Sequence, residues 1–271
     1  MQPGRGRGRE LLFASHLAPC IRPTYEFITR RLGEELGCPT TLIPAGPLEQ
    51  LAAGEVDFAF LCGLPYVRLR REEYSAVEAV AAPVVRGARY GGRPIYFSDV
   101  VVSRASPAAT FEDLRGCSWA YNEPDSHSGY LVTLFRLCQM GETTGFFGSW
   151  VMTGFHQESL RRVAYGQVDA SAIDSQVLSV ELRDHPELAE RVRVIDTLGP
   201  STIQPLVATR AVPDSLRRDV AEIVTGLALA EADRARLAQG LVERLVSVDD
   251  ACYDDIRGML EAVESAGLRV P

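Results

Sequence analysis

Residues 48–60 read LEQLAAGEVDFAF, and residues 160–172 read LRRVAYGQVDASA. The two stretches align without a gap, and they share a leucine, a glycine, a valine and an aspartate at matching positions. Each has the pattern of a helix that ends at a glycine, where left-handed backbone is easiest, followed by a buried strand. The repeated pattern predicts two similar lobes within one chain.

Outward from these stretches, strand-like apolar runs alternate with helical patterns. We expect strands at residues 11–14, 40–43, 57–61, 79–85, 95–102, 118–121, 168–173, 192–195 and 205–209. The residues after Pro213 are nearly all helical by pattern. Strands separated by helices predict an α/β fold with a largely parallel sheet.

No linker rich in Pro, Gly or Ser separates the two halves. We therefore expect two crossing strands, within residues 95–103 and 194–208, to join the lobes. Lobe one would comprise residues 1–98 and 205–271, and lobe two residues 99–204. Ligands of such folds lie beyond the carboxyl ends of the strands, in the cleft between the lobes.

The composition excludes several classes of function. The chain has 271 residues, 46% hydrophobic and 24% charged, which is enough for one large core or two modest ones. Its net charge of -8 argues against a nucleic-acid partner. All basic residues are arginines, so neither a P-loop lysine nor a Schiff-base lysine is present.

The six cysteines show neither a C-x-x-C pair nor another short metal-ligand spacing. A structural zinc site is not expected, and buried, inert thiols are the simpler interpretation. A metal site of His127, His156 and Asp174 is conceivable only if all three face one cleft. We expect no cofactor.

The amino-terminal stretch MQPGRGRGRELLFAS has no apolar run of signal-peptide length, and no window reaches transmembrane length. The sequence as written predicts a cytoplasmic protein that does not span a membrane. A processed or trimmed form of an exported protein would look the same.

Residues 122–130, NEPDSHSGY, follow an expected strand and precede the amphipathic pattern LVTLFRLCQMG. This run is either a solvated loop or the first turn of a helix. In a first turn the backbone N–H groups lack partners and the helix dipole favours negative charge, so the turn would bind an anion. We expect it to be exposed when no ligand is bound.

Other polar side chains also follow the ends of expected strands. Most are neutral donors, which suit recognition of a small oxyanion better than hydrolysis. They are Ser15, His16, Tyr66, Tyr96, Ser98, Ser126, His127, Ser128, His156 and Asp174.

Each of these residues also has a purely structural interpretation. His16 and His127 could satisfy nearby backbone groups, His156 and Asp174 could cap helices, and Tyr66 could belong to the core.

Three segments together resemble a known family: GEVDFAFLCGLPYV, TFEDLRGCSWAYNEPDSHSGY and GFHQESLRRVAYGQVDASAIDS. They are similar to the phosphate/phosphite/phosphonate-binding proteins, which are substrate-binding components of ABC importers with a type 2 periplasmic-binding fold. The resemblance covers most of the chain and implies a binding protein, with membrane subunits of an importer as partners.

The resemblance also implies a ligand site. The family's S-x-S-G turn, which holds phosphonate oxygens, matches Ser126, His127, Ser128 and Gly129. Its crossing-strand tyrosine and later histidine match Tyr96 and His156, and Asp174 matches an acid near the ligand's other end. A first-lobe tyrosine of the family is replaced here by Gly46 and Pro47.

These observations predict reversible binding of a phosphonate, phosphite or phosphate ester without turnover. The alternative is a cytoplasmic enzyme or ligand sensor on the same fold that acts on a small metabolite.

Overall fold

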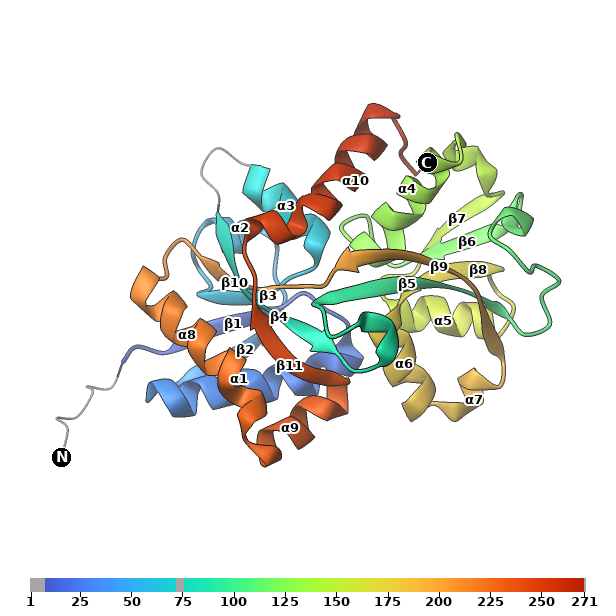
Figure 1. Ribbon diagram of the computed structural model, residues 1–271. Coiled ribbons are helices and arrows are strands. Elements are labelled where there is room, and N and C mark those ends of the chain that lie inside the picture. Colours follow the sequence, from blue (N-terminus) through green and yellow to red (C-terminus); the bar gives the residue numbers. More distant parts are fainter. Residues whose placement is uncertain (1–7, 72–75, 271) are drawn as a thin grey trace, which may run out of the picture. The chain divides into compact units, whose positions relative to one another are not determined.

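The computed structural model describes residues 8–71 and 76–270. Its chain divides into two compact units (Figure 1): unit 1 is Met1–Pro94 with Ile203–Tyr253, and unit 2 is Ile95–Thr202 with Asp254–Pro271. The chain thus passes three times from one unit to the other. Residues 254–271 belong with unit 2, whereas the sequence placed them in lobe one.

Unit 1 contains a six-stranded sheet with the order β11-β4-β10-β3-β1-β2. Its strands are β1 (Leu11–Ser15), β2 (Thr40–Pro44), β3 (Phe58–Phe60), β4 (Val77–Val85), β10 (Leu206–Thr209) and β11 (Val242–Ser247). Its α-helices are α1 (Arg22–Leu36), α2 (Glu49–Ala52), α3 (Gly63–Arg71), α8 (Asp214–Gly226) and α9 (Glu231–Leu237). Short 3-10 turns are η1 (Pro19–Ile21), η2 (Ala88–Tyr90), η6 (Leu227–Leu229), η7 (Ala238–Gly240) and η8 (Asp250–Tyr253).

Helices α8 and α9 each pack against α1, all three helices pack against strands of unit 1, and α3 packs against β4 (Figure 1). The core between them is aromatic and aliphatic. The rings of Phe13 and Phe58, on neighbouring parallel strands, stack with centroids 4.9 Å apart.

Unit 2 contains a five-stranded sheet with the order β7-β6-β8-β5-β9. Its strands are β5 (Ile95–Ser103), β6 (Ser118–Tyr121), β7 (Ser149–Met152), β8 (Ala170–Asp174) and β9 (Val192–Thr202). Its α-helices are α4 (Val132–Gln139), α5 (His156–Ala164), α6 (Ser175–Asp184), α7 (Pro186–Ala189) and α10 (Asp254–Ser265). A π-helical turn, η4 (His127–Leu131), leads into α4, and 3-10 turns are η3 (Glu112–Leu114) and η5 (Thr144–Phe146).

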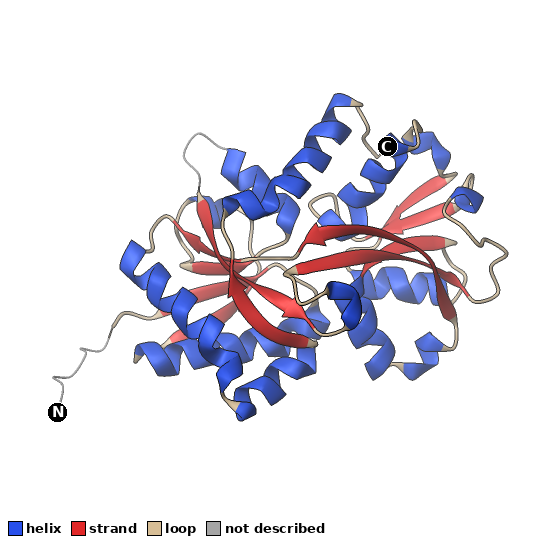
Figure 2. Cartoon of the chain, in the orientation of Figure 1, coloured by secondary structure: helices blue, strands red, loops and turns tan. Residues whose placement is uncertain are grey.

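Helices cover both faces of the unit 2 sheet, with α4 and α10 on one side and α5, α6 and α7 on the other (Figures 1 and 2). Trp119 and Phe147 stack beneath this cover, with ring centroids 4.5 Å apart. In the described part of the chain no helix is long and apolar enough to cross a membrane.

The prediction of an α/β fold is confirmed, but the prediction of largely parallel sheets is wrong. β1, β2 and β3 are parallel, as are β6, β7 and β8, whereas β4, β5, β9, β10 and β11 pair antiparallel. Strand β11 lies in the region expected to be nearly all helical. It forms because VERLVS pairs with the distant strand β4, and pairing between distant segments overrides local preference.

The repeated sequence pattern has the same structural role in both units. Gly54 and Gly166 adopt left-handed φ angles of 71° and 68° where each helix ends. Asp57 Oδ2 then accepts the N–H of Leu12 at 2.9 Å, and Asp169 Oδ2 accepts the N–H of Ser118 at 2.8 Å. Each aspartate thereby holds the neighbouring parallel strand at its start.

We expect Asp57→Ala to lower the free energy of unfolding by about 1–3 kcal/mol, because it removes a buried carboxylate that accepts the part-buried N–H of Leu12. Asp57 is 3% exposed, whereas Asp169 lies at an exposed position. Asp169→Ala removes the matching bond where water can replace it, and should therefore cost less. Urea denaturation of the two variants makes the comparison, and equal losses would contradict a role for burial.

Candidate anion-binding site

The candidate site lies at one edge of the unit 2 sheet. Strands β6, β7 and β8 are parallel, so their carboxyl ends meet at this edge. The turn containing residues 126–129 follows β6, His156 opens α5 after β7, and Asp174 ends β8. On the antiparallel strands β5 and β9, Tyr96 pairs with Ser201 at the same edge.

The turn after β6 begins a helix, as the sequence predicted. Ser126 is the N-cap residue, and its Oγ accepts the N–H of Gly129 at 3.0 Å. The π-helical turn from His127 to Leu131 continues directly into α4. Most N–H groups of a first turn have no partner within the helix, and the helix dipole gives this end partial positive charge. The turn therefore has the character of an anion site.

Two histidines connect the turn to the neighbouring elements. The Oγ of Ser128 and the Nε2 of His156 share a hydrogen bond of 2.9 Å, which joins the turn to the start of α5. The Nε2 of His127 and the Oγ of Ser201 share one of 2.8 Å, which joins the turn to β9. The Tyr96 ring lies 6.0 Å from the His127 ring. The structure thus brings five of the expected site residues into one cluster with Gly129.

Both histidines of the cluster are buried and neutral at physiological pH. His127 is 0% exposed and His156 is 6% exposed. Burial lowers the pKa of His127 to about 3 and the pKa of His156 to about 4, because a charged imidazole would lose its hydration. The cluster therefore offers hydrogen bonds without a formal positive charge.

The expectation that the turn is exposed when empty is wrong. Ser126, His127 and Ser128 are all buried. The turn contacts β8, β5, α4 and α10 of its own unit, and these elements shield it from water. Its hydroxyl groups consequently contribute to the packing of unit 2 as well as to any binding.

Gly129 permits a close approach that no other residue would allow. A Cβ atom at this position would collide with Asn122 Oδ1 and would lie 3.1 Å from His156 Cε1. Within the described residues, Asn122 Oδ1 and His156 Nδ1 are both buried without a hydrogen-bond partner. Buried polar atoms of this kind are costly unless something binds them. Both atoms carry lone pairs that accept hydrogen, so they mark the part of the cluster that a hydrogen donor or a proton could satisfy.

Asp174 lies at the same edge and caps a helix. Its Oδ1 accepts the N–H groups of Gln176 and Val177 at 2.8 and 3.2 Å, and the residue pairs with Ser98 on β5. Asp174 is 1% exposed. The capping interpretation of this residue therefore holds, and any role toward a ligand would be additional.

Tyr66 and His16 belong to unit 1. The Tyr66 hydroxyl donates to Asp250 at 2.9 Å, its ring lies 4.6 Å from that of Tyr253, and burial raises its pKa. His16 follows β1, where its N–H donates to the carbonyl of Phe60 at 2.9 Å, and burial lowers the pKa of its imidazole. Tyr66 is thus part of the core of unit 1, and His16 lies at the end of a strand.

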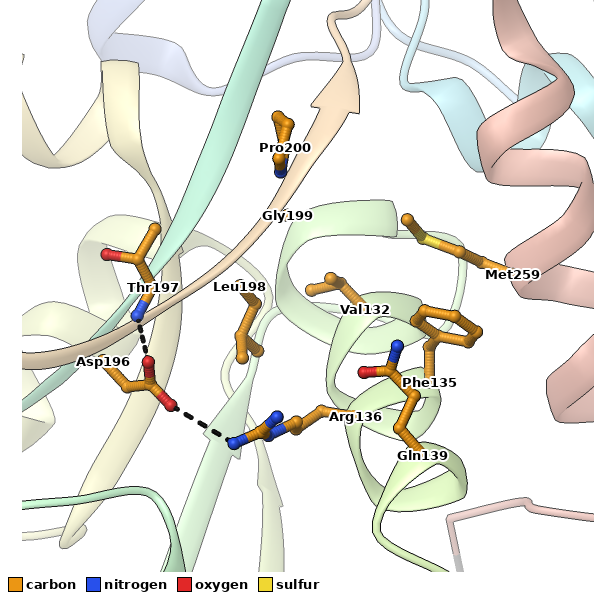
Figure 3. Close-up of a pocket in the computed structure, with 10 residues that line it drawn as sticks. All are labelled: Val132, Phe135, Arg136, Gln139, Asp196, Thr197, Leu198, Gly199, Pro200 and Met259. Carbon is orange, nitrogen blue, oxygen red and sulfur yellow. Dashed lines mark hydrogen bonds and ion pairs between the residues drawn. The ribbon is translucent and has the colours of Figure 1, made fainter. Parts of the chain in front are cut away.

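The first arginine after the turn does not supply a positive charge there. Arg136 Nη2 lies 3.2 Å from Glu112 Oε1 and 3.8 Å from Asp196 Oδ2. Figure 3 shows the guanidinium directed toward Asp196, beside a cavity of about 190 Å³ between α4, β9 and α10. The acidic partners hold this cation at the middle of α4, away from the helix start.

Sequence reasoning assigned no role to two members of the cluster, Asn122 and Ser201. Asn122 directly follows β6, and this position at a strand end could have indicated it. Ser201 gave no such signal, because only the pairing of β9 with β5 brings it to Tyr96. Among the described residues, no group of three His, Cys, Asp or Glu side chains is placed to hold a metal ion.

The chain belongs to a known family. A family model described as the phosphonate periplasmic substrate-binding protein of ABC transporters matches residues 21–253. The resemblance inferred from the sequence is therefore confirmed. Members are substrate-binding proteins and not enzymes, so the alternative of a cytoplasmic enzyme or sensor is not favoured.

Solved structures share the fold. A binding component of an ABC phosphonate transporter from Pseudomonas aeruginosa superposes with a TM-score of 0.84 at 17% identity, covering 96% of this chain and 88% of that chain. PhnD1 from Prochlorococcus marinus, in complex with methylphosphonate, gives 0.81 at 16% identity, covering 94% and 98%. A chloride-bound protein from Xanthomonas citri gives 0.72 at 15% identity, covering 95% and 98%. At these identities the likenesses confirm the type 2 periplasmic-binding fold.

The buried histidines predict an acid-sensitive fold. Because their pKa values are about 3 and 4 in the folded protein but near 6.5 when unfolded, the unfolded state binds more protons between these values. Their contribution to stability is complete above pH 6.5 and is lost as the pH falls toward 4. The free energy of unfolding of the ligand-free protein, measured from pH 7.5 to pH 4.5, should depend less steeply on pH for His156→Gln than for the wild type.

His185 provides the control, since its side chain is 41% exposed and lies outside the cluster, beside Glu181 and Glu187. In His185→Gln, the free energy of unfolding should differ between pH 7.5 and pH 4.5 by as much as it does in the wild type. An unchanged pH dependence in His156→Gln would show that His156 is not held neutral by folding.

We also expect Gly129→Ala to disrupt the cluster, because its Cβ must displace Asn122 or His156. Overpacking of this kind costs about 1–3 kcal/mol. Gly258→Ala, on α10, is the matched control, because a Cβ atom added there would meet no other atom within 4 Å. Only Gly129→Ala should have a lower melting temperature than the wild type. Equal melting temperatures of the two variants would contradict the close approach of Asn122 and His156 to Gly129.

Proposed function

We propose that this protein reversibly binds a small phosphorus oxyanion, a phosphonate, phosphite or phosphate ester, as the substrate-binding component of an ABC importer. The observation that carries the proposal is the buried, uncharged Ser126–Gly129 turn at the start of a helix. Family membership and the methylphosphonate bound by the Prochlorococcus marinus relative support the same ligand class.

The oxyanion would be held by donors that the cluster already orients. Ser126 accepts from Gly129, and Ser128 shares a hydrogen bond with His156, so each hydroxyl can still donate its own hydrogen to a ligand oxygen. Backbone N–H groups of the first turn and the Tyr96 hydroxyl would add further bonds. Bonds to a charged acceptor contribute about 1.5–3 kcal/mol each.

The rest of the ligand would lie toward other residues. Asp174 carries a carboxylate at the same sheet edge, which would favour a cationic or hydroxylated substituent. His16 and Tyr66 remain weaker candidates for contact, and the hydroxyl of Tyr66 is engaged by Asp250. Membrane subunits of the importer would then receive the ligand.

We expect the double variant Ser126→Ala, Ser128→Ala to weaken methylphosphonate binding at least about tenfold, equivalent to ~1.4 kcal/mol. Both changes remove hydroxyl donors from a site without formal charge. Isothermal titration calorimetry measures the effect. The double variant Ser149→Ala, Ser265→Ala, which alters two exposed serines of unit 2, is the control and should bind normally.

Because Ser126 caps the turn, the first variant should also melt earlier, and its binding is therefore measured well below its melting temperature. If the Ser126→Ala, Ser128→Ala variant melts earlier but binds methylphosphonate with normal affinity, the two serines have a purely structural role.

Calorimetry against a panel of phosphorus oxyanions, with NMR of the same samples, separates binding from turnover. Failure of every such oxyanion to bind at millimolar concentration would overturn the proposal.

A further inference from the structure

We propose that the site binds its oxyanion together with one proton, which His156 takes up when a doubly charged ligand enters. This inference rests on the proposed function. It concerns the charge of the complex. A doubly charged ligand and one protonated imidazole together carry a net charge of minus one.

The geometry of the cluster shows why a proton is required. The chain contains no lysine, and Arg136 is held by Glu112 and Asp196. Both arginines of α5 lie in its last turn, and Arg162 pairs with Glu158. A dianion at the turn would therefore be desolvated without a free cation from α4 or from the first turn of α5, and burial of an unpaired charge is strongly unfavourable.

The hydrogen bond between Ser128 and His156 identifies the group that takes up the proton. When Ser128 donates its hydrogen to the anion, its Oγ must accept from the Nε2–H of His156. This arrangement leaves a lone pair on His156 Nδ1, a buried atom that has no hydrogen-bond partner among the residues the structure describes. A proton bound there gives an imidazolium whose Cε1 lies beside Gly129 in the anion turn.

His127 is less suited to this role, because its Nε2 is bonded to Ser201 on β9 and not to a hydroxyl of the turn. Burial also lowers the pKa of His127 further than that of His156.

The elements packed around His156 carry acidic and neutral titratable groups and one arginine, Arg183, which is paired with an acid. Helix α5 packs against β5, β6, β8 and α6. These elements, the turn and the loop before it carry Tyr96, Asp99, Tyr121, Glu123, Asp125, His127, Tyr130, Asp174, Glu181, Arg183 and Asp184. Arg183 pairs with Asp184, and the other charged side chains of this set are acidic. A nearby negative charge raises the pKa of an imidazole. Burial alone keeps His156 neutral before the anion enters.

Calorimetry with methylphosphonate tests the proposal. Titrations in two buffers of different ionisation enthalpy, at a pH where the free ligand is a dianion, should show uptake of about one proton per site. Affinity should then fall about tenfold for each further unit of pH. Where the free ligand is a monoanion it brings the proton itself, so uptake should vanish and the affinity should become independent of pH.

His156→Gln can keep the bond to Ser128 but cannot hold the charge, so its proton uptake should approach zero. His185→Gln, at a partly exposed position outside the cluster, should retain the wild-type value. Loss of uptake in His127→Gln, with uptake kept in His156→Gln, would overturn the assignment to His156. Binding of the dianion by the wild type without proton uptake would overturn the proposal itself while leaving the proposed function intact.

Nitrogen NMR of the wild-type protein gives a result that does not depend on the folding of any variant. The chain has four histidines, so the imidazole signals can be assigned by single substitutions. The His156 ring should be neutral in the ligand-free protein and cationic in the methylphosphonate complex at the same pH. A neutral ring in the complex would refute the inference, and absence of binding would remove the proposed function together with it.

Discussion

The hydrogen bond between Ser128 and His156 is the interaction on which the candidate site depends. It joins the first turn of one helix to the first residue of another, and both partners are buried. A buried hydroxyl and a buried imidazole each require a partner, because water cannot reach them to replace it. The two strands that lead to these residues must therefore end at the same sheet edge, which the parallel pairing of β6 with β7 and with β8 ensures.

The same hydrogen-bond arrangement aligns neighbouring parallel strands in both units. An aspartate at the start of a strand holds the backbone of the neighbouring parallel strand, through Asp57 in unit 1 and Asp169 in unit 2. In unit 2 the strand held by Asp169 is β6, and the turn of residues 126–129 follows its other end. The antiparallel strands β5 and β9 then add Tyr96 and Ser201 to the same edge. The repeat in sequence thus serves strand alignment, whereas the residues of the candidate site come after the strands.

A site built from neutral donors suits a protein that must be stable both with and without its ligand. A buried arginine would be an uncompensated charge whenever the anion was absent, and a charge of that kind strongly destabilises a fold. Serine hydroxyls, first-turn N–H groups and a neutral imidazole avoid this cost in the empty site. The helix dipole would still favour an anion at the start of the helix, and a histidine is a group whose charge a change in its surroundings can alter.

The sequence by itself determined the local features of this protein. The helix after NEPDSHSGY, the α/β class and the repeated glycine-valine-aspartate pattern follow from periodicity and from the conformational freedom of glycine, which depend on neighbouring residues only. Tertiary structure decided what distant segments contribute. Only the tertiary structure made VERLVS a strand beside β4 and buried the turn of residues 126–129. It also brought Ser201 to His127 and formed the hydrogen bond between Tyr66 and Asp250. Burial and hydrogen bonding between residues far apart in the chain arise from packing, and they are not encoded in any short stretch of sequence.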